Sequence, residues 1–256
     1  MGFLTDLLDD LRRRLEHDPL DEPGLLALAM HLPPPRPFED ALRSAPPALI
    51  AEYKRSSPSA GAIAEPDVAS QARAYEEGGA AAISVLTEPT RFDGALADLR
   101  AVRLAVGLPV LRKDFLVHPA QVIESRAAGA DAVLLIAAAL SELELKGMLA
   151  IAADLGLDAL VETHSEEDLA KALATDAPMV GVNARDLETL EVDVDRALAM
   201  LSDVPSDRLA VLESGVSTRE DVERAIDARA GAVLVGETLM RSPDPAATIR
   251  SLRGAS

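Results

Sequence analysis

The 256-residue chain contains no cysteine, which excludes a disulfide framework, thiolate catalysis and any metal site with sulfur ligands. Long apolar runs are also missing, since the longest, AVLLIAAAL at 132–140, is about half of the roughly 20 residues that a membrane helix needs. At the N-terminus, MGFLTDLLDDLRRRLEH, the basic cluster follows the apolar positions and acids lie among them, the reverse of a secretory signal. We therefore expect a cytoplasmic protein that does not enter membranes.

Positive charge is scarce, and lysine is scarcer still. The formal charge of −18 argues against a nucleic-acid partner, because proteins that bind phosphate backbones concentrate positive charge. Of the 25 basic residues only four are lysine: Lys54, Lys113, Lys146 and Lys171. Lys146 and Lys171 lie in amphipathic helical segments and are interpreted as exposed, solubilising residues. Lys54 and Lys113 need another explanation.

The chain divides into a helical preface and a repeating pattern. In residues 1–46 a helical stripe, Leu4, Leu7, Leu8, Leu11 and Leu15, is followed by the breaking segment HLPPPRPF. From residue 47 to 256, short apolar runs alternate with helical segments at a period of about 25 residues. The runs are PALIAEY, AAISVL, LPVLR, DAVLLI, DALVE, PMVGV, RLAVLE and GAVLVG.

Eight βα units whose strands are apolar on both faces predict an α/β protein, a (β/α)8 TIM barrel that forms a single catalytic domain behind the N-terminal helical extension. An open doubly wound sheet is the alternative, but no GxGxxG turn follows the first strand. Helix boundaries are predicted at Pro66 and Gly78 for one helix, and at a Ser217 capping box with Glu220 and a stop at Gly231 for another.

Charged residues end several of the predicted strands, which is where barrel enzymes place their chemistry. A single charge at such a position is normally the first solvated residue of a loop, but this set would converge on one mouth. Its members are Glu52, Lys54, Lys113, Glu162, Asn183, Arg185 and Glu213. Lysine and glutamate suit proton transfer, because partial burial lowers the lysine pKa and raises that of glutamate, whereas arginine stays protonated. His164 is interpreted as a loop or capping residue and is left out.

The last two units predict an anion site and the scarce aromatics predict an apolar wall. Gly215 in ESGVST and Gly236 in VGETL stand where backbone N–H groups can hold a phosphate, so we expect a phosphorylated small molecule as the substrate. Two of the four phenylalanines, Phe92 and Phe115, fall in the loops after the second and third strands. If both line the mouth, they present a flat surface to an aromatic ring.

Seven blocks of sequence, in order across residues 47–250, closely resemble the motifs of the indole-3-glycerol phosphate synthase family. They are AEYKRSSPSAG, ISVLTEPTRFDG, PVLRKDFLVHPAQVIESRAAGADAVLLI, LVETH, GVNARDLETLEVD, LESGVST and VGETLMRSPDP. The resemblance implies ring closure of 1-(2-carboxyphenylamino)-1-deoxyribulose 5-phosphate, with loss of carbon dioxide and water, to give indole-3-glycerol phosphate for tryptophan synthesis. It implies no cofactor and no metal, and an N-terminal region that helps to close the barrel mouth.

The resemblance also implies roles for the proton-transfer residues. Lys113 resembles the general acid that protonates the substrate carbonyl, Glu162 the general base of the dehydration, and Lys54 a residue that assists proton delivery near the substrate's anionic groups. Glu52 and Asn183 would orient these groups, and Glu213 would complete the polar floor.

The remaining matches concern substrate binding. Arg185 is suited to the substrate carboxylate through its planar fork. The phosphate-loop matches are Ser57, Ser214, Gly215, Gly236 and Glu237, and the matches around the aromatic ring are Phe92, Phe115, Leu134 and Leu187. Two departures are small: Tyr53 replaces a branched aliphatic residue, and Glu237 replaces the serine of some members, so we expect only its backbone N–H to bind phosphate.

Three other functions remain open from the sequence. Phosphoribosylanthranilate isomerase is a phosphate-binding barrel of the same pathway, but it often uses cysteine and aspartate. A Schiff-base aldolase would also use a buried lysine such as Lys113. A non-catalytic barrel would bind only a phosphorylated ligand or a partner enzyme. We expect a monomer or a weak homodimer.

Overall fold

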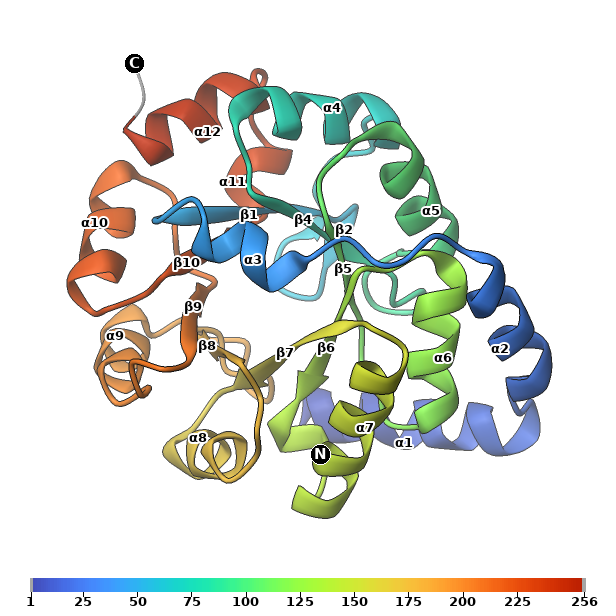
Figure 1. The fold of residues 1–256 in the computed structure, drawn as a ribbon. Coiled ribbons are helices and arrows are strands. Elements are labelled where there is room, and N and C mark those ends of the chain that lie inside the picture. The colour runs from blue at the N-terminus through green and yellow to red at the C-terminus, as the bar shows by residue number, and fades with distance from the viewer. Residues whose placement is uncertain (1, 255–256) are drawn as a thin grey trace.

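In the computed structural model, which describes residues 2–254, the eight predicted strands form one closed parallel barrel (Figure 1). The strands are β1 (Ala48–Tyr53), β4 (Ala82–Leu86), β5 (Val110–Lys113), β6 (Ala132–Ile136), β7 (Asp158–Thr163), β8 (Met179–Asn183), β9 (Leu209–Glu213) and β10 (Ala232–Val235). They pair in chain order, and β10 closes the barrel on β1 with Leu49 opposite Val233. The predicted TIM barrel is confirmed, and an open sheet is excluded.

A ring of helices covers the outside of the barrel, so most strand residues are buried on both faces (Figure 1). The ring contains α4 (Val68–Gly78), α5 (Leu96–Ala105), α6 (Pro119–Ala128), α7 (Glu142–Asp154), α8 (Glu166–Leu173), α9 (Val194–Ser202), α10 (Arg219–Asp227) and α12 (Pro245–Arg253). A short 3-10 helix, η1 (Ala137–Ala139), and a short helix, α11 (Glu237–Met240), follow β6 and β10. This double burial is the reason that the strands read as apolar runs without alternation.

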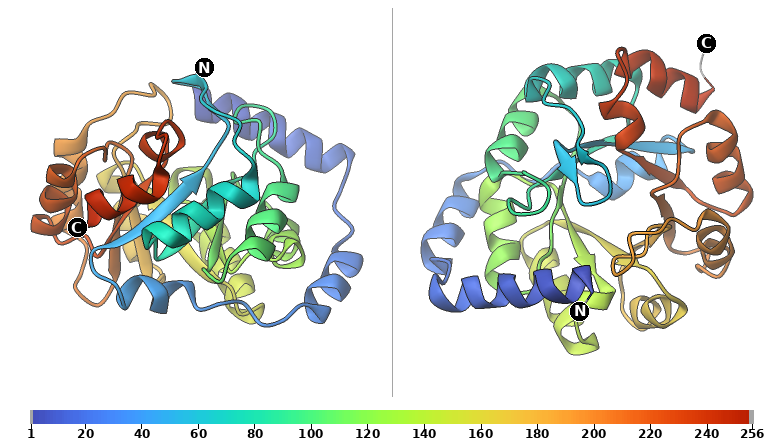
Figure 2. Two further views of the ribbon diagram at one scale, coloured as in Figure 1. Left: turned by 90° about the horizontal axis from the view of Figure 1, so that it is seen from above. Right: turned by 180° about the vertical axis from the view of Figure 1, so that it is seen from behind.

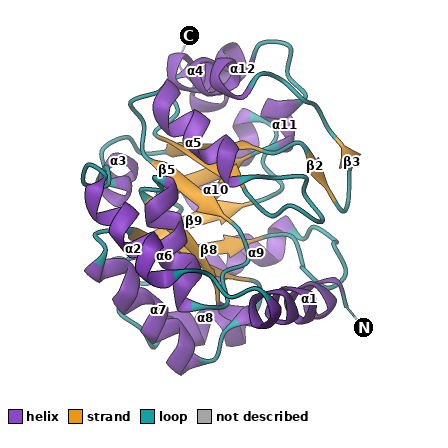
Figure 3. Ribbon diagram, turned by 90° about the vertical axis from the view of Figure 1, so that its right-hand side faces the viewer, coloured by secondary structure: helices purple, strands orange, loops and turns teal. Residues whose placement is uncertain are grey.

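The predicted N-terminal extension is helical and touches both ends of the barrel. It contains α1 (Phe3–His17), α2 (Glu22–His31) and α3 (Phe38–Arg43). Helix α1 lies at the end where the strands finish, as does the hairpin of β2 (Ser56–Ser57) and β3 (Gly61–Ala62), whereas α2 and α3 lie at the opposite end (Figures 2 and 3). On α1 the buried side chains are Leu4, Leu7, Leu8 and Leu11.

Two carboxylates fix the chain at the opposite end. Asp131 accepts a 2.7 Å hydrogen bond from the Arg36 N–H, and Asp158 accepts bonds of 2.7 and 2.9 Å from the N–H groups of Phe38 and Glu39. The division into an extension and a barrel at residue 46 stays a prediction, and Met1 and 255–256 lie outside the described residues.

The predicted helix boundaries are shifted by one to a few residues. Helix α10 is capped by Thr218 in a box with Asp221, not by Ser217 with Glu220, and the left-handed residue that follows it is Arg229 (φ 72°) rather than Gly231. At α4 the cap is Asp67, whose carboxylate accepts from the Ser70 N–H, so Pro66 precedes the helix.

The end of α4 is set by Gly79 (φ 88°), one residue beyond the predicted Gly78, because the left-handed conformation falls on the second glycine. The interpretation of Lys171 as exposed is also wrong, since its Nζ donates to the carbonyls of Ala137 (2.7 Å) and Leu140 (3.1 Å). Lys146 is exposed as predicted and pairs with Glu142. Among residues 2–254 no helix is both long and apolar enough to cross a bilayer.

Candidate active site

A cavity of about 440 Å³ opens at the carboxyl ends of the strands, and every residue predicted for the site from the sequence lines it. The ends of β1, β5, β7, β8 and β9 bring their polar and charged residues together here, as expected for a parallel barrel. Placement alone does not assign a role, so the individual roles stay predictions.

Lys113 and Glu162 form the centre of the cavity floor. Lys113 Nζ donates a 2.7 Å hydrogen bond to Glu162 Oε2 and lies 3.4 Å from Glu213 Oε2. The other oxygen of Glu162, Oε1, accepts from the Asn183 amide at 3.2 Å. Glu162 and Glu213 are each only 1% exposed, so these charges interact in a medium of low polarity.

The surroundings set the protonation states of these three groups. Burial lowers the pKa of Lys113, but the carboxylates of Glu162 and Glu213 outweigh it and raise that pKa above its ordinary value. For Glu162, burial raises the pKa, and the opposing Lys113 charge and the contact with His164 bring it well below its ordinary value. The predicted directions for Lys113 and Glu162 are therefore wrong, because pairing outweighs burial.

Glu213 behaves in the opposite way. Burial, followed by the negative charge of Glu162, raises the pKa of the Glu213 carboxyl well above its ordinary value, against the attraction of Lys113. Neither carboxyl oxygen has a hydrogen-bond donor within the described part of the chain. The two glutamates beside Lys113 therefore have pKa values shifted in opposite directions, down for Glu162 and up for Glu213.

His164 contacts this centre, although the sequence interpretation left it out. His164 lies in the turn after β7, as expected for a loop residue, and its backbone N–H donates to Asp168 Oδ2 in the first turn of α8. The imidazole, however, is buried, with Nε2 only 2.9 Å from Glu162 Oε1. A histidine two residues after a strand-end glutamate lies on the same side of an extended chain, and that spacing could have indicated the contact.

Glu52 and Lys54 form a second pair at the end of β1, with Lys54 Nζ 2.6 Å from Glu52 Oε1. Gly236 faces this pair. A Cβ on Gly236 would stand 2.3 Å from Glu52 Oε1 and 2.9 Å from Lys54 Nζ. The glycine is therefore required to leave room for the pair, in addition to any contact with phosphate.

Two loops that line the cavity carry the residues predicted to bind phosphate through backbone N–H groups. Ser214 (φ 66°) and Gly215 (φ 78°) after β9 both have left-handed backbone. The other loop follows β10 and leads from Gly236 into α11. The Glu237 carboxylate pairs with Arg241 at 2.9 Å on the same helix, and the expectation that only its backbone binds an anion stays a prediction.

Three phenylalanines form an apolar wall on another side. The rings of Phe92 and Phe115 lie 6.1 Å apart, and Phe3 packs edge-on against Phe92 at 6.5 Å. Phe3 comes from α1 and was missed in the sequence because its position at the start of a helical stripe resembles ordinary core packing. Leu134 and Leu187 continue the wall.

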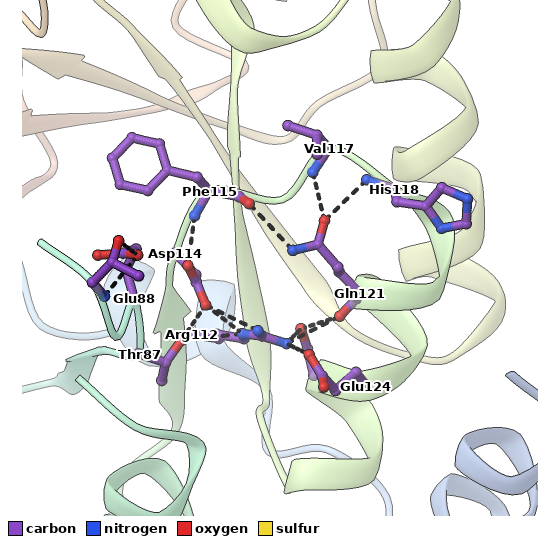
Figure 4. A network of polar contacts seen from close by, with 11 residues as sticks. Thr87, Glu88, Arg112, Asp114, Phe115, Val117, His118, Gln121 and Glu124 are labelled. Carbon is purple, nitrogen blue, oxygen red and sulfur yellow. Dashed lines mark hydrogen bonds and ion pairs between the residues drawn. The ribbon is translucent and has the colours of Figure 1, made fainter. Parts of the chain in front are cut away.

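A buried network holds the loop that follows Lys113 (Figure 4). Arg112 points away from the cavity and donates to Asp114 at 2.9 Å, to Glu124 at 2.9 Å and to Thr87 at 3.2 Å. The other oxygen of Asp114 accepts from the Phe115 N–H at 2.9 Å. Because Lys113 and Phe115 flank Asp114, the network fixes the backbone of both.

Arg185 and Tyr53 are each held by local contacts. The Arg185 guanidinium donates to the carbonyl of Leu190 at 2.9 Å, and its N–H donates to Asn183 Oδ1 at 3.0 Å. Tyr53 is 2% exposed, donates to the Pro66 carbonyl at 3.2 Å and has the Arg55 guanidinium 5.5 Å from its ring centre. The local packing around this departure from the family pattern is therefore complete.

A sequence model described as indole-3-glycerol phosphate synthase matches residues 5–252. The chain belongs to this family. Among curated relatives named indole-3-glycerol phosphate synthase, the protein of Leifsonia xyli subsp. xyli is 50% identical over 99% of both chains. That of Nocardioides sp. is 48% identical over 99% of both, and that of Mycobacterium avium is 52% identical over 88% of this chain and 84% of the relative.

Solved structures with lower identity share the fold. 3-Hexulose-6-phosphate synthase aligns with a TM-score of 0.63 at 18% identity, covering 81% of this chain and 98% of the other. A thiamine phosphate pyrophosphorylase from Pyrococcus furiosus aligns with a TM-score of 0.62 at 17% identity, covering 83% and 96%. Indole-3-glycerol phosphate synthases are decarboxylating lyases of tryptophan biosynthesis, so the chain is an enzyme of that class.

Proposed function

We propose that the cavity closes the indole ring of 1-(2-carboxyphenylamino)-1-deoxyribulose 5-phosphate to give indole-3-glycerol phosphate. The observation that carries this proposal is the 2.7 Å contact of Lys113 Nζ with Glu162 Oε2, between an aromatic wall and two backbone loops suited to phosphate. The acid and the base of the reaction are thus adjacent, in a cavity whose walls match the two ends of the substrate.

The first step needs an acid. As the ring carbon that bears the carboxylate attacks the substrate carbonyl, a carbon–carbon bond forms and the carbonyl oxygen takes a proton from Lys113. Carbon dioxide then leaves from the same ring carbon and the ring regains its aromaticity. The carboxylates of Glu162 and Glu213 raise the pKa of Lys113 and keep it protonated, so the transfer occurs once the substrate carbonyl oxygen takes the place of Glu162 beside the ammonium and the pKa returns toward its ordinary value.

The second step needs a base. The hydroxyl produced in the first step leaves as water, and the adjacent proton goes to Glu162, whose lowered pKa keeps it ionised. Lys54 assists proton delivery to the departing hydroxyl, while Glu52 and Asn183 orient the reacting groups. Glu213, whose pKa is raised by burial and by Glu162, completes the polar floor, where its protonated form donates a hydrogen bond to a substrate hydroxyl.

Binding groups complete the assignment. The Arg185 guanidinium holds the substrate carboxylate, and the apolar wall of Phe92, Phe115, Leu134 and Leu187 receives the aromatic ring. The phosphate is bound by Ser57 and by the loops that carry Ser214, Gly215, Gly236 and Glu237, the last through its N–H. These roles require no cofactor or metal ion.

The proposed oligomeric state, partners and location follow from the charge of the chain and from the residues that make up the site. One chain supplies all the proposed groups, so the proposed active form is a monomer or a weak homodimer. A formal charge of −18 gives no basis for a nucleic-acid partner, and we propose a cytoplasmic enzyme with a small phosphorylated substrate.

The test is incubation of the protein with this substrate while indole absorbance and fluorescence are followed. The chain has no tryptophan, so new indole emission has little background. Absence of turnover despite tight binding would indicate a non-catalytic barrel instead. Borohydride trapping of a substrate adduct on Lys113 would indicate Schiff-base chemistry.

A further inference from the structure

Gly181 stands at a position inside the barrel where a side chain has no room. It lies on β8, opposite Glu162 of β7 in the strand register, and its carbonyl accepts a 2.8 Å hydrogen bond from Thr163. A Cβ built on Gly181 would come within 2.2 Å of Glu213 Oε1 and 3.3 Å of Glu213 Cδ. The carboxyl group of Glu213 therefore occupies the space that any other residue at 181 would fill.

The backbone itself does not require glycine here. The residues with positive φ include Gly129, Gly156 and Gly215, but not Gly181, which has the ordinary conformation of a strand. Glycine in a strand interior weakens the strand, because it costs conformational entropy and supplies no side chain for packing. The reason for glycine at this position lies in its neighbour and not in its own dihedral angles.

We propose that Gly181 is a positioning residue, whose missing side chain fixes the depth at which the Glu213 carboxyl lies beside Lys113 and Glu162. This inference rests on the role proposed above for Glu213. At its present depth the carboxyl is 1% exposed and lies 3.4 Å from Lys113 Nζ, and neither of its oxygens accepts a hydrogen bond from residues 2–254. Burial and the neighbouring Glu162 raise the pKa of this carboxyl and Lys113 opposes them, so a shift of the carboxyl would alter all three influences.

An added methyl group would move the carboxyl more readily than the strand. The atom that it meets is the free end of a flexible side chain, and the next neighbour, Leu160 Cδ1, lies at an ordinary 3.5 Å. Carbon and oxygen atoms need about 1 Å more separation than the 2.2 Å available, so the Glu213 carboxyl must shift by roughly that distance. A misplacement of about 1 Å in a catalytic arrangement can cost on the order of 100-fold in rate.

The experiment is a cycle of three variants: Gly181→Ala, Glu213→Ala and the double change. We expect Gly181→Ala alone to lower kcat about 10- to 100-fold with KM for substrate changed less than about threefold, because the phosphate loops are untouched. In the Glu213→Ala background the clash is gone, so adding Gly181→Ala should change kcat by less than about threefold.

Gly147→Ala is the matched control and should leave kcat unchanged, because in residues 2–254 its added Cβ has no neighbour within 4 Å beyond the adjacent residues and the backbone of its own helix. An equal loss from Gly181→Ala in both backgrounds would overturn the proposal, since the effect would then not pass through Glu213. If Gly181→Ala does not fold, recovery of the fold in the double variant supports the proposal, and failure of the double variant overturns it. Full kcat in Glu213→Ala alone would instead remove the role proposed for Glu213.

Discussion

Lys113 and Glu162, which lie on strands that are not adjacent in the barrel, share a 2.7 Å hydrogen bond, and each sets the charge of the other. The proposed acid and base are therefore one ion pair. Removing either partner would leave a buried charge without its counterion, which is expensive in the protein interior. A variant that tests either role must therefore keep the charge of the side chain while it removes the ability to transfer a proton.

Lys113→Arg separates charge from proton transfer. Arginine keeps the positive charge beside Glu162, but it stays protonated whether or not it is paired, whereas the pKa of lysine returns toward its ordinary value when substrate separates it from Glu162. Because proton transfer by a placed side chain is worth about 10²- to 10⁴-fold, we expect Lys113→Arg to lose nearly as much kcat as Lys113→Met. Lys54→Arg, which keeps an anion contact, should be milder.

Steady-state kcat and substrate affinity for the three variants decide the matter, with Lys146→Arg as a control on an exposed helix. A Lys113→Arg enzyme within about threefold of the parent kcat would show that a fixed positive charge is sufficient, and the general-acid role would be lost.

Gly215→Ala tests the phosphate loop. Gly215 has φ 78°, and a Cβ there would stand 2.5 Å from Val194 Cγ2, so the loop must move. We expect KM to rise about 10-fold or more with a smaller loss of kcat, as for a binding group distant from the reacting bonds. A bulkier residue at 215 should have a larger effect in the same direction.

Inorganic phosphate should compete with substrate in the parent and do so more weakly in Gly215→Ala. Gly156→Ala controls for backbone strain, since Gly156 has φ 70° and its nearest neighbour, Pro35, is 3.7 Å from the added Cβ. Unchanged KM in Gly215→Ala would contradict the phosphate assignment.

Glu213→Gln should stabilise the fold at neutral pH while lowering activity. The folded pKa of Glu213 lies above its unfolded value, so the native state binds more protons than the unfolded state, and its contribution to stability falls as pH rises above about 4.5. A neutral amide of the same shape avoids that loss. A gain of about 1 kcal/mol at pH 7 would raise Tm by roughly 2–4 °C.

Thermal unfolding of the parent and Glu213→Gln from pH 7 down to pH 4.5 checks the direction in which the stability difference changes with pH. The gap in Tm should narrow as the solution becomes more acidic, because the carboxyl in the unfolded chain then also takes up its proton. A gap that widens toward acid would mean that Glu213 is ionised in the folded protein.

Asp114→Asn tests the network that holds the loop after β5 (Figure 4). The change leaves the buried Arg112 guanidinium with Glu124 as its remaining carboxylate partner, and a lost hydrogen bond to a charged group costs about 1–3 kcal/mol. We expect a lower midpoint in urea unfolding and a lower kcat, because Lys113 and Phe115 flank Asp114. The exposed pair of Arg13 and Asp10 is the control, where Asp10→Asn should change stability by less than about 0.5 kcal/mol.

The sequence could predict the strands because their burial is nearly complete. Each apolar run matches one barrel strand to within a few residues, and parallel strands place their ends at one mouth whatever their lengths. Helix ends were less predictable. Ser217 and Thr218 can both cap, and only the conformation of the chain selects Thr218.

The protonation states of the site residues could not be predicted from the sequence, because they depend on distances between side chains. Burial alone predicts a lowered pKa for Lys113, and only the 2.7 Å approach of Glu162 reverses it. The contact of His164 with Glu162, the place of Phe3 in the wall and the space left by Gly181 likewise depend on side chains from distant parts of the chain.

The N-terminal extension holds α1 at the mouth while its following segment is fixed at the base by Asp131 and Asp158. Helix α1 therefore binds the barrel intramolecularly. Its effective concentration at the mouth is about millimolar, the value typical of short linkers. Its contacts with the barrel include the 3.0 Å bond from Thr5 to Glu188 and the packing of the buried side chains of Leu4, Leu7, Leu8 and Leu11. The eight-stranded barrel closes without any residue of α1, so we expect a chain that begins after α1 to fold with a weaker substrate affinity. A separate α1 peptide should restore that affinity, and it needs a concentration near the effective one to match the tethered helix.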